Sequence, residues 1–210
     1  MQLGEIITRV QRQFGDEVQA QITEDDVVRW VNDACLEIVT NNATNQGSVG
    51  TTTIVVGQFI YDLPADLLLL RSVRVNGRKL KGSTYEQLCE MDPDIENTVG
   101  EPNHYWVYGG KLNLYPIPDS DLGNINILYV KTPDIMTVDM KTLEPDVPKQ
   151  YHPRIVEYCI AQAAELDDNL GHYQLKMGQF KENISSIRQN SEQPESDSYY
   201  PSITYVGEPW

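Results

Sequence analysis

Few side chains in this sequence have the type and spacing that metal binding or nucleophilic catalysis requires. The three histidines are His104, His152 and His172, and the three cysteines are Cys35, Cys89 and Cys159. No histidine has a second histidine or a cysteine at the spacing of a zinc site, and the cysteines are odd in number and far apart. We therefore expect no metal, no cofactor and no disulfide framework, as is typical of a reducing compartment.

Two acidic loops could suggest calcium binding, MDPDIEN at residues 91–97 and DSDLGN at residues 119–124. An EF-hand loop needs Gly at its sixth position and Glu at its twelfth, but the second loop has Gly at its fifth and Val130 at its twelfth. In the first loop, Pro93 and Ile95 occupy intervening sites. Glycine-rich phosphate loops, G-x-S-x-G and H-E-x-x-H are also lacking, so we expect solvated turns and not an enzyme.

The C-terminal stretch PESDSYYPSITYVGEPW carries four large aromatic side chains. Its prolines and glycine exclude a helix, whereas Ile203, Tyr205 and Val206 favour an extended strand. Tyr and Trp bury large areas at interfaces at low entropic cost. We predict a partner-binding arm at residues 191–210, with the contact residues Tyr199, Tyr200, Pro201, Ile203, Tyr205, Val206 and Trp210. The alternative is that the arm docks onto its own domain.

The charge balance restricts the class of partner. The chain has 16 basic and 31 acidic residues, which gives a net charge of −15. A nucleic-acid groove needs a basic footprint, and docking on anionic membranes needs basic clusters. The balance instead fits a soluble protein that repels DNA or binds a basic partner. The N-terminal sequence has no signal-peptide pattern, and the longest apolar run, Leu67–Leu70, is too short to cross a bilayer.

Helical patterns occur at both ends of the chain. Near the start, apolar residues recur at helical spacing up to Phe14, Gly15 ends the helix, and Thr23 is the expected N-cap of a second helix with a wide apolar stripe. After Pro153, two further amphipathic helices are expected on either side of DDNLG. Their apolar faces comprise Ile155, Val156, Cys159, Ile160, Ala163 and Leu166, and then Tyr173, Met177, Phe180, Ile184 and Ile187.

The middle of the chain has strand patterns. Asn76-Gly77 and Gly109-Gly110 each separate two β-type runs and predict hairpins, and Ser83–Glu86 fits a capping box that opens a short helix. The sequence therefore predicts an α+β fold. We expect a helical bundle at residues 1–48 and 145–190, an inserted small antiparallel β domain at residues 50–133, and the extended arm at residues 191–210.

An ordered set of segments resembles the head-to-tail connector, or adaptor, proteins of tailed bacteriophages. The segments are LGEIITRVQRQFGDE, ITEDDVVRWVNDACLEIV, YDLPADLLLLRSVRVNGRKL, YWVYGGKLNLYPIP and YHPRIVEYCIAQAAELDDN. The resemblance implies a structural virion protein of the neck, made in the host cytoplasm. It implies a homo-oligomeric ring, typically a dodecamer, that binds the portal protein and a tail, nozzle or neck protein. Genomic DNA would pass through the ring without specific binding, and no membrane is involved.

A free acidic protein-binding module, such as a DNA mimic, is the alternative function. A mimic needs carboxylates at phosphate-like spacing, and its binding to a DNA-binding protein would depend steeply on salt. The acidic residues here are scattered along the chain, and the long β insertion has no role in mimicry. The connector therefore ranks first.

Overall fold

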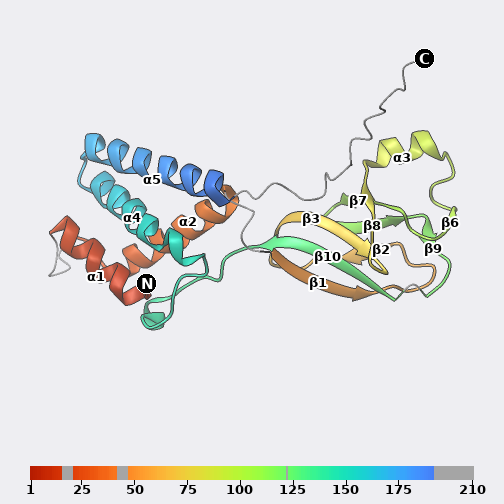
Figure 1. Cartoon of the computed structure of the whole chain (residues 1–210), viewed down its shortest axis with the longest axis horizontal. Helices are drawn as coiled ribbons and strands as arrows, with labels where there is room; N and C mark the ends of the chain where they lie inside the picture. The colour runs from red at the N-terminus through yellow and green to blue at the C-terminus, as the bar shows by residue number, and fades with distance from the viewer. Residues whose placement is uncertain (16–20, 42–46, 122, 192–210) are drawn as a thin grey trace, which may run out of the picture.

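The computed structural model of the chain describes residues 1–15, 21–41, 47–121 and 123–191 and has an α+β fold (Figure 1). The long helices are α1 (Leu3–Phe14), α2 (Glu24–Asn41), α4 (His152–Leu166) and α5 (Leu170–Ser191), with a short α3 (Tyr85–Met91) and two 3-10 turns (Val138–Met140, Lys149–Tyr151). The strands are β1 (Gly47–Thr53), β2 (Ile60–Asp62), β3 (Leu67–Val75), β4 (Arg78–Lys79), β5 (Lys81–Gly82), β6 (Val99–Gly100), β7 (His104–Tyr108), β8 (Lys111–Tyr115), β9 (Ile117–Pro118) and β10 (Asn124–Lys131).

Local signals set the ends of the first two helices. Gly15 takes a left-handed conformation (φ 84°), and its N–H bonds to carbonyls of the last turn of α1. At the start of α2, Thr23 Oγ1 accepts the Asp26 N–H at 3.2 Å, while the Thr23 N–H donates to the Asp26 carboxylate at 3.2 Å. Both helix boundaries agree with the sequence prediction.

Both expected hairpins are present. Asn76 and Gly77 have φ of 48° and 78° between β3 and β4, and Gly109 and Gly110 have 57° and 74° between β7 and β8. Positive φ at two successive turn residues matches the twist of the flanking strands, and such turns favour Asn and Gly. These turns therefore fix the register of both hairpins.

The strands form two four-stranded sheets, ordered β1-β10-β3-β4 and β2-β8-β7-β5, and the pair β6-β9. The long pairs are antiparallel as predicted, but β5 pairs with β7 and β6 pairs with β9 in parallel. A second difference concerns α3, whose capping box uses Thr84 and Gln87 instead of Ser83 and Glu86. The Ser83 N–H donates to Tyr105 O of β7 at 2.9 Å, directly after β5, and the N-cap of the helix is the next residue.

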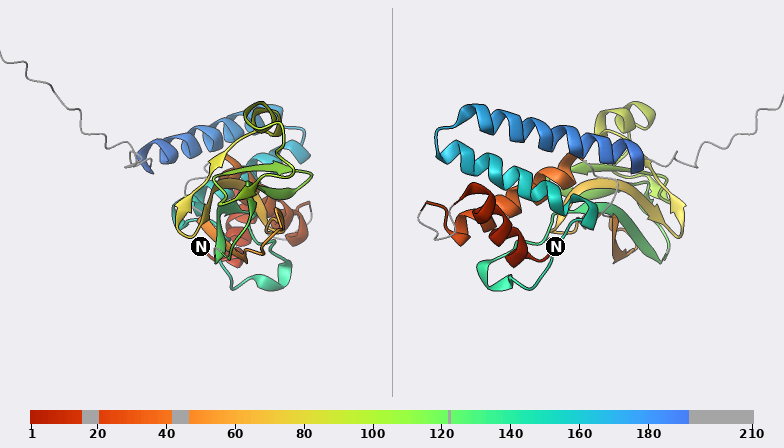
Figure 2. Two further views of the ribbon diagram at one scale, coloured as in Figure 1. Left: turned by 90° about the vertical axis from the view of Figure 1, so that its right-hand side faces the viewer. Right: turned by 60° about the vertical axis from the view of Figure 1, so that its left-hand side comes forward.

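Two groups of buried side chains hold the chain together. The helical core joins α1, α2, α4 and α5, and it includes Leu3, Ile6, Trp30, Ile38, Ile155, Cys159 and Phe180. The sheet core includes Ile54, Tyr61, Val73, Leu112, Leu114, Ile125 and Ile127. Helices from the two ends of the sequence thus share one core, with α4 and α5 packed side by side (Figure 2). This confirms the predicted α+β fold with a β insertion.

The segment between β10 and α4 ties the first helices to the last ones. Leu3 and Gly4 donate their N–H groups to Leu143 O (2.8 Å) and Lys141 O (2.9 Å). Asn32 on α2 makes two hydrogen bonds to the backbone of Met136, at 3.0 and 2.9 Å. Because these bonds satisfy buried or half-buried backbone groups, the connection is a fixed part of the bundle.

Candidate interaction surfaces

All seven predicted contact residues of the arm lie outside the described residues, so the arm stays a prediction. These residues are Tyr199, Tyr200, Pro201, Ile203, Tyr205, Val206 and Trp210. The last described element is α5, which ends at Ser191. A chain of nineteen further residues at about 3.4 Å each spans roughly 65 Å when extended. The arm is therefore long enough to reach a neighbouring molecule.

Among the histidines and cysteines, His152 and Cys35 are buried in the fold. His152 is buried, its Nε2 lies 3.0 Å from Val147 O, and burial lowers its pKa. Burial also raises the pKa of the Cys35 thiol to about 12, with a smaller contribution from Asp146. Among the residues that the structure describes, no group of three or more His, Cys, Asp or Glu side chains could hold a metal ion.

The acidic loops use their carboxylates in local hydrogen bonds. Asp92 accepts the hydroxyls of Thr98 at 2.5 Å and Tyr115 at 2.8 Å, and these bonds lower the pKa of its carboxyl group. In the second loop, Asp121 accepts the Gly123 N–H at 3.0 Å. Each carboxylate therefore closes a turn next to a strand, which is a structural use of the charge.

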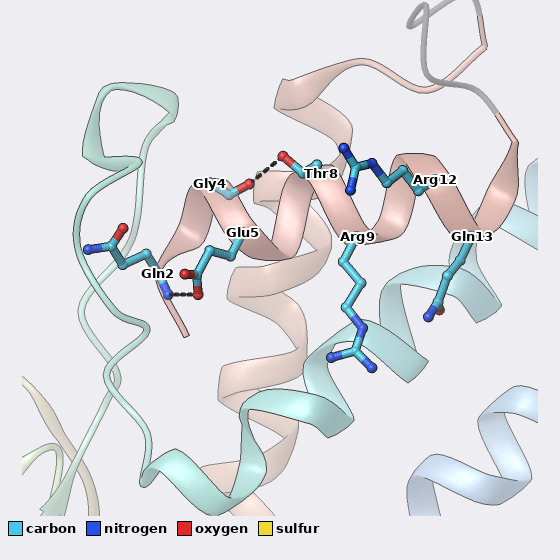
Figure 3. Close-up of a pocket in the computed structure, with 7 residues that line it drawn as sticks. All are labelled: Gln2, Gly4, Glu5, Thr8, Arg9, Arg12 and Gln13. Atoms are coloured by element: carbon cyan, nitrogen blue, oxygen red, sulfur yellow. Dashed lines mark hydrogen bonds between the residues drawn. The ribbon is translucent and has the colours of Figure 1, made fainter.

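The outer face of α1 forms a shallow cationic groove of about 650 Å³ (Figure 3). Arg9 and Arg12 are exposed on it, one helical turn apart, and neither forms an ion pair within the described ranges. In Figure 3 the labelled side chains lie on the side of α1 away from α2, which is behind it. In Figure 3 the two side chains point away from each other, Arg12 upward and Arg9 downward, so each arginine is a separate cationic contact on a chain with a charge of −15.

An aromatic pocket of about 370 Å³ lies over the second sheet. Phe59 and Trp106 stack with ring centroids 6.5 Å apart, and Tyr85 of α3 lies 6.0 Å from Trp106. Ile95, Leu114 and Ile117 complete the apolar lining, and Glu96 lies at the same pocket. Apolar pockets with few polar groups bind apolar or aromatic side chains.

Sequence reasoning missed both of these surfaces. The spacing of Arg9 and Arg12 on the polar side of a predicted helix was a usable signal for the first. The pocket had no such signal, because it joins Phe59, Tyr85 and Trp106 from three separate segments of the chain. Residue types alone do not show which elements meet.

Comparison with known proteins places the chain in a family. Within the described residues no helix is both long and apolar enough to cross a bilayer. No curated protein matches the sequence. The family model described as SU10 adaptor protein matches residues 1–203, which is nearly the full length. The chain therefore belongs to the SU10 adaptor protein family, whose members are structural head–tail adaptors of bacteriophages.

Proposed function

We propose that this chain forms a homo-oligomeric ring, typically a dodecamer, at the lower end of the portal in the virion neck. The ring would continue the DNA channel and seat the tail or nozzle, after synthesis of the chain in the host cytoplasm. The family match over residues 1–203 carries this proposal. The helical bundle of residues 1–48 and 145–190 and the β domain of residues 50–133 would give the ring two different faces, one for the portal and one for the tail.

The charge of the chain supports a passage for DNA. Each copy carries −15, so a ring of such copies is strongly acidic and repels the phosphate backbone. An acidic wall would let DNA slide without specific binding. This part of the proposal requires carboxylates on the inner wall of the ring.

The arm of residues 191–210 would bind the portal protein. Its four aromatic side chains are typical anchors, and an extended segment can cover much of a partner's surface. The stretch from Ile203 to Val206 favours an added strand on an exposed sheet edge of the partner.

Electron microscopy of the protein mixed with the portal protein of the same phage tests the ring. We expect class averages with an additional coaxial ring and a central opening, compared with the portal alone. Portal particles that stay unchanged would contradict the proposal. Tight binding to a basic DNA-binding protein, with steep salt dependence and without a ring, would favour the acidic-module function instead.

A further inference from the structure

Strand β1 has an unprotected edge. On one side it pairs with β10 over all seven residues, Gly47 to Thr53, and no strand pairs with its other side in the part of the chain that the structure describes. Natural edge strands are usually protected by charged side chains, proline, bulges or short length. Strand β1 has none of these, since its seven residues are GSVGTTT. Its side chain Val49 is 63% exposed. An edge of this kind favours pairing with another chain.

The hydrogen-bond pattern shows which groups of β1 are free. The Ile54 N–H donates to Gly123 O at 2.8 Å, so Ile54 belongs to a hydrogen-bonded pair with β10. In an antiparallel ladder such pairs alternate with non-bonded pairs. The N–H groups of Ser48, Gly50 and Thr52 therefore face β10. Those of Val49, Thr51 and Thr53, the outward amides, face away from it.

The same sheet has a second free stretch on its opposite side. Strand β3 pairs with β10 from Leu67 to Val75, with two register shifts that leave Leu68 and Arg71 without a partner. On its other side, β4 pairs with Arg74 and Val75, and the Leu80 N–H donates to Val73 O at 2.9 Å. The upstream part of β3, residues 67–71, has no strand beside it within the described residues, and Leu69 is 43% exposed. Figure 1 shows β1 and β3 on either side of β10, with α1, α2, α4 and α5 beyond one end of these strands.

We propose that β1 of one copy adds to residues 67–71 of β3 in the neighbouring copy, so that the sheets continue from copy to copy around the ring. Two different edges on opposite sides of one sheet make a heterologous contact, which closes into a ring when the rotation allows it. Both strands are antiparallel to β10 and so run in the same direction. Copies rotated about an axis along the strands would therefore pair them in parallel.

This inference rests on the proposed ring. Amide hydrogen exchange tests the strand pairing separately from the formation of the ring. Exchange is measured at the outward amides in the free chain and in the ring assembled on the portal. We expect these amides to exchange fast in the free chain and at least about tenfold more slowly in the ring, while the amides facing β10 are protected in both. A ring in which the outward amides still exchange fast would overturn the strand pairing alone. The absence of any ring would overturn the proposed function as well.

A pair of substitutions at Val49 gives an independent test. Val49→Pro removes an outward N–H. Proline is tolerated at such a position, because an edge strand needs no N–H on its unpaired side. Val49→Thr changes the same exposed side chain but keeps the N–H. We expect Val49→Pro to raise the concentration needed for assembly by about tenfold or more, at an unchanged melting temperature, and Val49→Thr to assemble normally. Normal assembly of a folded Val49→Pro variant would contradict the pairing.

Discussion

Binding to the portal protein should weaken strongly when alanine replaces the four aromatic residues of the arm, Tyr199, Tyr200, Tyr205 and Trp210. An aromatic side chain that acts as a true anchor contributes on the order of 2 kcal/mol, which is about 30-fold in affinity. The four effects need not add, because neighbouring anchors share their environment. Titration of the portal protein with each single variant and with the quadruple variant measures the loss.

The matched controls keep the arm and change small polar residues in it. Ser196→Ala and Ser198→Ala should leave the affinity within a few tenths of a kcal/mol, as surface substitutions usually do. Removal of residues 192–210 should leave the melting temperature of the isolated chain unchanged, because the helices that form the helical core lie within residues 3–191. Near-neutral alanine variants would show that these aromatics are not anchors. A large drop in melting temperature would show that the arm packs on its own domain.

Phe180→Ala should destabilise the chain by about 3–5 kcal/mol. Phe180 on α5 is fully buried, and its ring meets that of Tyr158 on α4 at a centroid distance of 5.0 Å, edge to face. The substitution would leave a cavity in the core that joins the N-terminal and C-terminal helices. Chemical unfolding followed by circular dichroism measures the loss in free energy.

Leu175→Ala is the control for this experiment, since it lies on the same helix and is 58% exposed. It should change the free energy of unfolding by less than about 0.5 kcal/mol. A similar small effect of Phe180→Ala would mean that α5 is not packed into the helical core. Two separate unfolding transitions, one for the N-terminal helices and one for the C-terminal helices, would also contradict a shared core.

The sequence predicted those features of the fold that depend on a few neighbouring residues. Gly15 marks a helix end because glycine accepts the left-handed conformation, and Thr23 marks a helix start because its hydroxyl can accept a backbone N–H. Asn76-Gly77 predicts a hairpin for the same conformational reason. The helical periodicity also identified most of the residues by which the terminal helices meet in the core. Leu166 is a wrong prediction: it is the last residue of α4 and is 62% exposed, because the helix ends there beyond the packed turns.

Features that depend on distant residues could not be predicted from local patterns. The helix α3 starts one residue late because the Ser83 N–H donates to Tyr105 O, which is in strand β7. The parallel pairs β5-β7 and β6-β9 and the aromatic pocket likewise need the tertiary arrangement. The contact residues of the arm lie outside the described residues, so their role stays a prediction.

The mass of the complex with the portal protein of the same phage tests whether this chain is a portal-binding adaptor. Full-length protein and a variant that ends at Ser191 would each be mixed with assembled portal and measured by native mass spectrometry. We expect the full-length chain to add the mass of a complete ring and the shortened chain not to bind. The connector function would be contradicted if neither protein bound the portal while the full-length chain remained a folded monomer.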